Sequence, residues 1–237
     1  IKKWSVKSRK RKCTRKELLK RIKKEIQSLT TSSDLKQKKI KESEYQGQLK
    51  DFEQQTTDAN KFIVELIQEN GASAETAALY AKKHELRALS SLSKEETLTH
   101  TNEAIKILET AFQRTYNYYP GIKLIYNKID RGELLKNPED IQEALKLAPT
   151  VLTTTLKEGG RYSGDIWTLG TMMEATLLSG KKDPGLEDMY LKSGTISWQY
   201  GTTYNKLVQA HKNLTSMKSE LGDVENIDSI IEGLERF

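Results

Sequence analysis

The chain has 237 residues, of which 30% are charged, and its formal net charge is +6. It has no run of about 18 uncharged apolar residues, so we expect no transmembrane segment. Its basic start lacks the apolar core of a secretory signal, and its single cysteine excludes an internal disulfide framework. These features favour a cytoplasmic protein, and the first residue, Ile1, indicates a piece of a longer chain.

The positive charge is concentrated at one end of the chain. Residues 1–26 hold 13 of the 39 Lys and Arg residues and 2 of the 33 Asp and Glu residues. This segment therefore carries a charge of +11, and the remainder carries −5. The basic balance belongs to an N-terminal arm and not to the body of the protein.

We assign residues 1–33 to a basic arm that contains one helix. A capping box at Thr14–Glu17 starts this helix, because Glu17 is placed to reach back to the helix start. Leu18, Leu19 and Ile22 begin a narrow apolar stripe along it. The basic residues that define the arm are Lys7, Arg9, Lys10, Arg11, Lys12, Arg15, Lys16, Lys20 and Arg21.

Residues 34–70 are predicted to form a long helix. From Tyr45 onward, apolar and small residues alternate at spacings of three and four up to Leu66, which resembles a heptad seam. The seam is too short to require a coiled coil. An antiparallel hairpin with the basic helix, or docking as the first helix of a repeat array, remains open.

Residues 71–221 are predicted to form helical repeats. Ser73 opens a helix with Ala77, Ala78 and Ala81 near one face, and the polar stretch 90–99 is interpreted as an inserted connection. The next helix, which begins near Ala104, carries an apolar face.

The centre of this region, residues 104–149, is predicted to contain three helices. Asn117–Gly121 separates the first two, because Pro120 cannot continue a helix but suits the first turn of the next. Gly132 is predicted to end the second helix in the left-handed conformation. Pro138 begins the third helix, and Pro149 is predicted to stop it.

This central stretch fits the roughly 34-residue tetratricopeptide pattern of paired helices. Leu124 takes the large position of the first helix, Ile141 the bulky position of the second, and Ala144 the small one. Three positions depart from the pattern, since Ile125 stands where glycine or alanine is usual, Lys128 where an aromatic residue is usual and Asn137 where alanine is usual.

The C-terminal part continues the array after a loop at 157–164. Asp165 is predicted to cap the most apolar helix, and Asp183 with Pro184 restarts the chain for its partner. A final long helix extends to Leu221, and the acidic residues 222–237 carry enough Ile and Leu to dock as a terminal helix or tail. The predicted fold class is therefore all-α, a tetratricopeptide-like right-handed helical-repeat solenoid with a basic helical N-terminal extension.

Four segments occur in an order that resembles a known family. They are Ser73–Leu89, Ala104–Phe112, Asn117–Lys123 (NYYPGIK) and Asp165–Gly180. Together they resemble the tetratricopeptide-like regulatory region, or TRAF-binding domain, of apoptosis signal-regulating kinases and its stand-alone bacterial relatives. The resemblance implies a helical scaffold that binds protein partners within signalling assemblies. The chain has no glycine-rich phosphate loop, His-Arg-Asp or Asp-Phe-Gly motif of a kinase.

First helices of successive tetratricopeptide repeats line a concave groove, and the register above places aromatic and charged residues there. An aromatic stripe at helical spacing also packs between repeats, so partner contact and core packing are both open. The residues predicted to line the partner-binding groove are Tyr119, Ile122, Tyr126, Asp130, Trp167 and Glu174.

The sequence offers little catalytic or metal-binding chemistry. His84, His100 and His211 are far apart, and no spacing typical of zinc ligands, a phosphate loop or a nucleophile elbow is present. Cys13 lies among basic residues that favour its thiolate, but an ordinary exposed thiol is the simpler interpretation. We expect no enzyme activity, no metal and no cofactor.

The predicted function is a non-catalytic scaffold that binds a protein or peptide partner in a signalling complex. One alternative is a nucleic-acid-binding module in which the arm neutralises phosphates. The arm also suits an anionic surface, or it is a solvated linker. A second alternative is a ligand-sensing regulatory domain of a longer effector protein.

Overall fold

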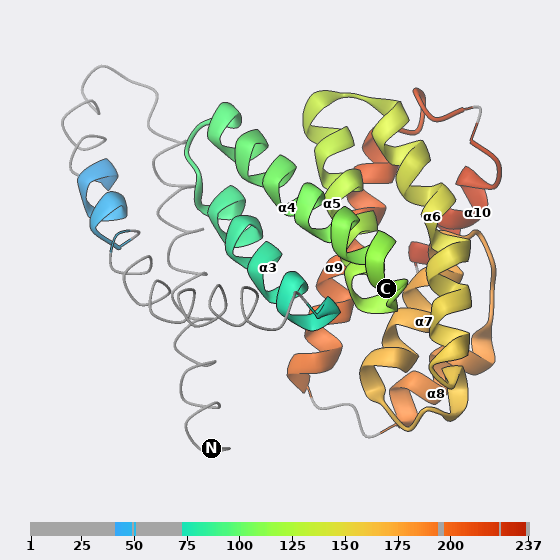
Figure 1. The fold of residues 1–237 in the computed structure, drawn as a ribbon. Helices are drawn as coiled ribbons and strands as arrows, with labels where there is room; N and C mark the ends of the chain where they lie inside the picture. Colours follow the sequence, from blue (N-terminus) through green and yellow to red (C-terminus); the bar gives the residue numbers. More distant parts are fainter. Residues whose placement is uncertain (1–40, 49, 51–72, 194–196, 223, 236–237) are drawn as a thin grey trace. The chain divides into compact units, whose positions relative to one another are not determined.

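The computed structural model describes residues 41–48, 50, 73–193, 197–222 and 224–235. This part of the chain is helical and contains no strand, which confirms the all-α class (Figure 1). The elements from residue 73 onward are α3 (Ala74–Ser90), α4 (Lys94–Thr115), α5 (Tyr118–Leu135), α6 (Pro138–Lys157), the short 3₁₀-helix η2 (Gly160–Tyr162), α7 (Ile166–Leu178), α8 (Pro184–Lys192), α9 (Ser197–Ser216) and α10 (Ile227–Leu234).

The chain divides into two compact units. The first joins the N-terminal part, described at 41–48 and 50, to residues 83–100, and the second contains residues 73–82 and 101 onward. Helices α3 and α4 therefore each contribute to both units. The predicted boundaries at 33/34 and 70/71 lie outside the described residues.

In the first unit, α3 and α4 are joined by a very short turn. Only residues 91–93 separate them, and the Ser93 hydroxyl accepts a hydrogen bond from the Glu96 amide at 3.0 Å. The prediction that 90–99 is a connection was therefore wrong beyond residue 93. Its polar, acidic composition is that of a first helical turn, where Glu95 and Glu96 face the positive end of the helix dipole.

In the second unit, α5 and α6 form a tight pair of neighbouring helices. The break predicted at Asn117–Gly121 is present, and Asn117 caps α5 by accepting a hydrogen bond from the Tyr119 amide. Gly121 allows a close approach, because a Cβ there would lie 2.7 Å from Val151 of α6 and 2.8 Å from Phe112 of α4. The lack of a side chain at this position lets three helices meet.

Gly132 does not end α5, contrary to the prediction. The helix continues to Leu135, and Lys136 takes the left-handed conformation with φ of 56°. A Cβ on Gly132 would lie 2.6 Å from Ile141. Gly132 therefore allows α5 and α6 to pack closely and does not end α5.

Pro149 does not stop α6, which runs through it to Lys157. A proline inside a helix costs about 3 kcal/mol, because it removes one backbone hydrogen bond and crowds the preceding turn. Ala148 and Val151 on either side are both fully buried, and α6 packs on α5 and α7. Packing of the whole helix outweighs the local penalty.

Helices α7 and α8 begin where the sequence predicted, at the Asp165 cap and at the restart of the chain at Asp183 and Pro184. Asp165 accepts a hydrogen bond from the Thr168 amide at the start of α7, and Asp183 does the same for Leu186 in α8. Helix α9 ends at Ser216, five residues before the predicted Leu221. The acidic end docks as α10, which packs on α7 and α9 through its buried apolar residues.

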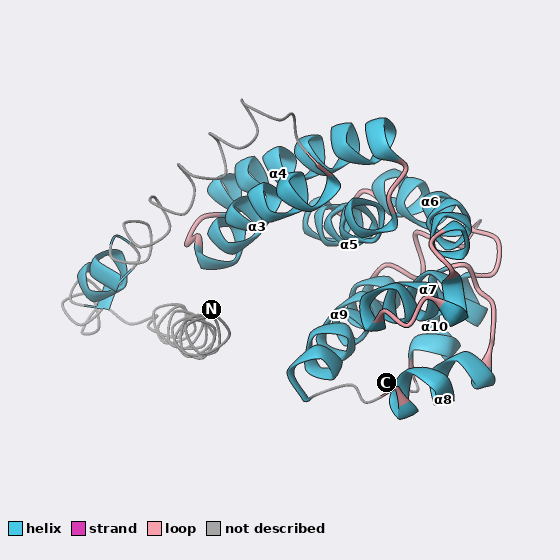
Figure 2. Cartoon of the chain, turned by 60° about the horizontal axis from the view of Figure 1, so that its bottom comes forward, coloured by secondary structure: helices cyan, strands magenta, loops and turns pink. Residues whose placement is uncertain are grey.

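Helix α9 lies against the face that α5 and α7 share. Both α5 and α7 contact α6, and both also contact α9. Figure 2 shows α5, α6 and α7 following one another, with α9 beside α5 and α7. A segment that comes late in the sequence therefore covers helices from the centre of the chain.

Candidate functional site

The predicted groove residues come from α5 and α7, and the structure divides them into two groups. Tyr126 and Glu174 are buried, at 5% and 7% exposure, and interact with residues of α9, as does Asp130. Nearer the starts of the two helices, Tyr119 is partly buried and Trp167 is 36% exposed.

Ile122, the sixth predicted residue, belongs to the hydrophobic core, with 4% of its surface exposed. Of the two roles left open by the sequence, partner contact and core packing, Ile122 therefore has core packing. The other predicted residues lie on a face that the chain covers in part with its own α9.

Asp130 of α5 is joined to α9 by a hydrogen bond. The side-chain amide of Asn213 donates to Asp130 Oδ1 at 2.8 Å, and the side-chain amide of Gln209 donates to Asn213 Oδ1 at 2.7 Å. Asn213 is only 4% exposed. Hydrogen bonds of a neutral donor to a carboxylate are stronger than neutral pairs, so this contact fixes the C-terminal half of α9 on α5.

Glu174 of α7 lies at the centre of the covered face. Burial raises the pKa of its carboxyl to about 8, while the Tyr126 hydroxyl and the charge of Lys206 oppose this shift. Lys206 Nζ lies 5.4 Å from the centre of the Tyr126 ring, within range of a cation–π contact. At neutral pH the Glu174 carboxyl is therefore mostly protonated and can act as a hydrogen-bond donor.

The polar pair of Tyr126 and Glu174 is only partly satisfied. Burial and the nearby Glu174 raise the pKa of the Tyr126 phenol well above its ordinary value, so this hydroxyl stays protonated. It interacts with Glu174, but it has no partner at normal hydrogen-bond geometry within the described part of the chain. A buried polar group in this state reduces the stability of the helix contact around it.

The face of α9 that meets α5 and α7 has helical spacing. Thr203 accepts a hydrogen bond from the Tyr190 hydroxyl of α8 at 3.1 Å, close to Gly170 of α7. The buried apolar residues between 201 and 216 of α9 are Leu207, Ala210 and Leu214. The candidate site is therefore a helix-binding face that α9 occupies.

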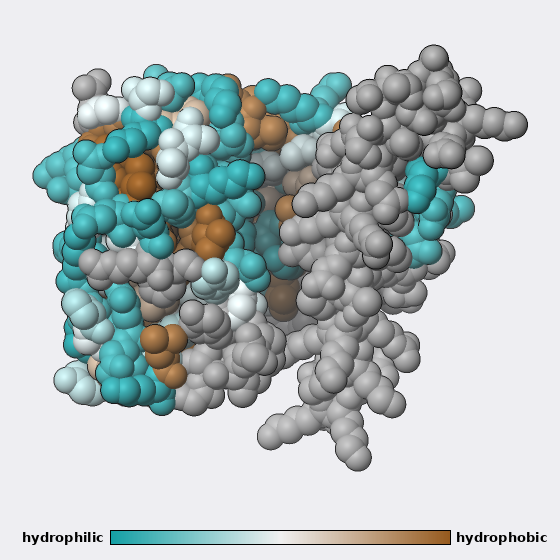
Figure 3. Space-filling view, turned by 180° about the vertical axis from the view of Figure 1, so that it is seen from behind, coloured by the Kyte–Doolittle hydropathy of each residue, from teal (hydrophilic) through white to brown (hydrophobic). Residues whose placement is uncertain are grey.

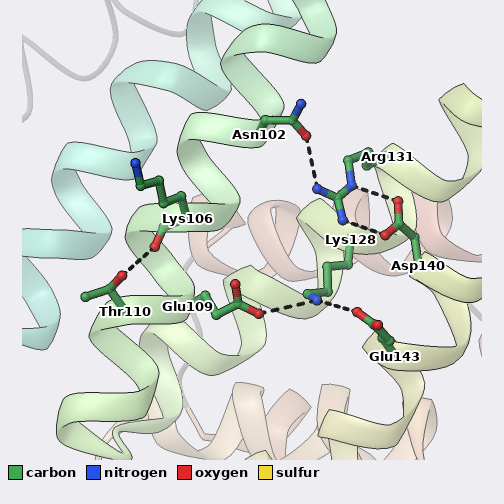
Figure 4. A network of polar contacts seen from close by, with 8 residues as sticks. All are labelled: Asn102, Lys106, Glu109, Thr110, Lys128, Arg131, Asp140 and Glu143. Atoms are coloured by element: carbon green, nitrogen blue, oxygen red, sulfur yellow. Dashed lines mark hydrogen bonds and ion pairs between the residues drawn. The ribbon is translucent and has the colours of Figure 1, made fainter.

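A polar network joins α4, α5 and α6 (Figure 4). Lys128 is buried, and its ammonium lies 2.7 Å from Glu143 and 3.5 Å from Glu109. Arg131 donates to both oxygens of Asp140 and to Asn102. The departure of Lys128 from the repeat pattern was the signal for this network, because a lysine at an aromatic position needs anionic partners.

A second feature that the sequence did not predict lies in the first unit. The Nδ1 atoms of His84 and His100 are 3.3 Å apart, although 16 residues separate them in the chain. The residues that the structure describes hold no group of three or more His, Cys, Asp and Glu side chains suited to a metal ion. The pair is therefore a contact between α3 and α4.

A pocket of about 400 Å³ lies between η2, α7 and α8, away from the predicted groove. Its charged lining residues are two cations, Arg161 and Lys192, and two anions, Asp165 and Asp188. The lining therefore has no net formal charge and favours neither an anion nor a cation.

The exposed surface of the second unit shows scattered apolar residues. On the face drawn in Figure 3, apolar side chains of described residues form separate small patches among polar ones. Tyr162 of η2 is the extreme case, at 92% exposure. Single exposed apolar residues are normal on protein surfaces and do not define a binding site.

The basic arm lies outside the described residues, and so do Cys13 and most of the predicted heptad seam. The site residues proposed for the arm therefore stay predictions.

No family model, no curated protein and no solved structure matches this chain. The resemblance to the TRAF-binding region remains a prediction from the residues quoted above. The helices that the structure describes include none long and apolar enough to cross a membrane.

Proposed function

We propose that this chain is a non-catalytic helical-repeat scaffold that binds a helical segment of a protein partner in a signalling complex. In this proposal α5 with α6 and α7 with α8 are two tetratricopeptide-like hairpins of a right-handed solenoid. Their short connections and close contacts support this arrangement. The first helix of each pair, α5 or α7, then supplies the concave face.

One observation carries the proposal. The face of α5 and α7 receives an amphipathic helix, α9, through Tyr126, Asp130 and Glu174, which the repeat register assigns to the groove. Binding of an amphipathic helix in a groove is a recurring mode of protein recognition. The chemistry that holds α9 is therefore suited to a helical partner.

A photo-cross-linking experiment tests the scaffold function. A photoreactive amino acid replaces Tyr119 or Trp167 in the full chain, and Tyr162 in a control, because Tyr162 is exposed but lies on η2. We expect one protein to be captured through positions 119 and 167 and not through 162. Capture through position 162 alone would contradict binding at the α5–α7 face.

The charge of residues 1–26 favours one alternative, in which the arm binds nucleic acid. Neutralised phosphates release counterions, so the affinity would fall steeply with salt. Binding of a duplex and of a single strand is measured at two salt concentrations, with the full chain and with a chain that lacks residues 1–26. A steep salt dependence that disappears with the arm would support this alternative.

A further inference from the structure

We propose that α9 is an exchangeable internal ligand, and that the α5–α7 face binds in its place a partner helix that carries lysine and, seven residues later, asparagine on its apolar side. This inference rests on the proposed scaffold function and names the chemistry of the partner. The occupant is a helix of another protein, and its required residues follow from the contacts that α9 makes.

The spacing of the polar contacts defines the partner. Lys206 and Asn213 are seven residues apart, so they lie two turns apart on one side of α9. Lys206 meets the Tyr126 ring beside Glu174, and Asn213 meets Asp130. A shift of the helix by one turn would move Asn213 away from Asp130 and Lys206 away from Tyr126, so the two contacts together fix the position of the helix.

The apolar contacts between these two positions add a size requirement. Leu207 and Leu214 are fully buried, and Ala210 between them is 1% exposed. Because Ala210 is buried, a large side chain at its position would not fit without movement of the surrounding helices. The partner helix therefore needs leucine at the positions one and eight after its lysine, and a small residue at the position four after it.

Exchange is possible because the covered face is imperfectly satisfied. The Tyr126 hydroxyl is buried without a hydrogen bond of normal geometry to any described residue, and the Glu174 carboxyl beside it is desolvated. Polar networks that are only partly satisfied stabilise a helix contact less than an apolar interface of the same size. A partner helix that supplies one more donor or acceptor there has an advantage over α9.

The test uses the full chain and a labelled peptide with the sequence of α9, residues 197–216, as the probe. Asn213→Asp places a carboxylate against Asp130 and weakens α9 in its own chain, but it leaves α5 and α7 unchanged. Asn205→Asp is the matched control, because it makes the same change on an exposed residue of the same helix. Fluorescence anisotropy measures binding of the peptide to each chain.

We expect the Asn213→Asp chain to bind the peptide at least about tenfold more tightly than the unaltered chain, since a groove that is more often open binds with higher apparent affinity. The Asn205→Asp chain should bind like the unaltered chain. A peptide with alanine in place of Lys206 and Asn213 should bind poorly to all three.

A rescue variant separates exchange from general unfolding. It combines Asp130→Asn with Asn213→Asp, so that the new amide on α5 can donate to the new carboxylate on α9. Helix α9 then docks again, and peptide binding should return to the level of the unaltered chain. Hydrogen exchange of α5 and α7 should stay slow in every variant, whereas exchange of α9 should quicken only in Asn213→Asp.

Equal peptide binding by Asn213→Asp and Asn205→Asp would overturn the inference, whether or not α9 exchanges faster. A dimer that forms by exchange of α9 between two copies would overturn it too, because the occupant would then be this chain.

If cross-linking through positions 119 and 167 persists in either case, the scaffold function stands with a different ligand. Tighter peptide binding by Asn213→Asp without any such cross-link would support exchange of α9 and contradict the scaffold function.

Discussion

At the scale of single residues, Asp165 joins two helices as well as capping one. Its Oδ2 accepts hydrogen bonds from the Thr168 amide at 2.8 Å, from the Thr168 hydroxyl at 2.7 Å and from the Tyr118 hydroxyl of α5 at 3.1 Å. Burial alone would raise the pKa of this carboxyl, but the hydrogen bonds from Thr168 and Tyr118 outweigh burial and lower it. The start of α7 is thereby tied to the start of α5.

We predict that Asp165→Ala lowers the free energy of unfolding by about 1–2 kcal/mol at pH 7, the usual range for loss of an N-cap. Because the pKa of Asp165 is lower in the folded state, its contribution is present above its ordinary pKa of 3.8 and is lost as the pH falls through the folded value. Urea unfolding at pH 7 and pH 3 measures both effects.

The control for this prediction is Asp188→Ala, which removes an exposed ion pair with Lys192 within α8. Exposed pairs contribute little, so the loss should stay below about 0.5 kcal/mol. An equal loss in both variants would show that Asp165 acts only as a surface charge.

Lys128 gives a second prediction at this scale, because its ammonium is buried between Glu109 and Glu143. We expect Lys128→Met to change stability by less than about 1 kcal/mol, or to stabilise, since an apolar residue needs no charge partner. Replacing both glutamates by glutamine leaves the buried cation unpaired and should cost about 2 kcal/mol or more. A variant that combines Lys128→Met with both glutamine substitutions should have the same free energy of unfolding as Lys128→Met alone, because no buried cation is then left unpaired.

At the scale of the helix, the contacts of Gly132 in α5 lead to a prediction opposite to the one from helix propensity. Alanine is favoured over glycine inside a helix by about 1 kcal/mol. At Gly132, however, the new Cβ would lie 2.6 Å from Ile141 Cγ1 and 2.9 Å from the Asn137 carbonyl oxygen. We expect Gly132→Ala to destabilise by about 1–2 kcal/mol, because overpacking outweighs propensity.

Gly201 in α9 is the matched control. No described atom lies within 4 Å of a Cβ built there, so Gly201→Ala should stabilise by up to about 1 kcal/mol. Thermal unfolding of both variants should give shifts of opposite sign. Shifts of the same sign would mean that the contact between α5 and α6 yields to the added methyl group.

Local signals in the sequence were sufficient for several helix starts but not for the helix ends predicted at Gly132, Pro149 and Leu221. Asn117, Asp165 and Asp183 were predictable because a cap depends on neighbours in the chain. Gly132 and Pro149 were assigned as helix ends because glycine and proline usually disrupt helices. Their positions inside helices depend on close contact between α5, α6 and α7, which local propensity does not contain.

At the scale of the molecule, the sequence predicted the residues of the α5–α7 face but not what covers them. Tyr126, Asp130 and Glu174 followed from the repeat register. That α9 packs on them depends on contacts such as Asn213 with Asp130, which are 83 residues apart. Such contacts leave no periodic signal, because each requires only one suitable side chain on each helix.

The covered face gives a prediction about pH, since Glu174 has a pKa of about 8 in the folded chain and an ordinary value of 4.5. Between pH 4.5 and about 8, the Glu174 carboxyl is ionised in the unfolded chain and protonated in the folded chain. The contribution of this group is therefore fully present below about pH 4.5 and is lost as the pH rises toward 8, at roughly 1.4 kcal/mol per unit at most.

We predict that Glu174→Gln removes this dependence, because the amide has the same shape and carries no titrating proton. The variant should gain stability relative to the unaltered chain as the pH rises from 5 to 8, and the gain should level off above 8. Urea unfolding at pH 5, 7 and 9 measures the difference, with Glu225→Gln as a control at an exposed carboxyl. Parallel curves for Glu174→Gln and the unaltered chain would mean that water reaches the carboxyl beneath α9, and that the helix does not seal the face.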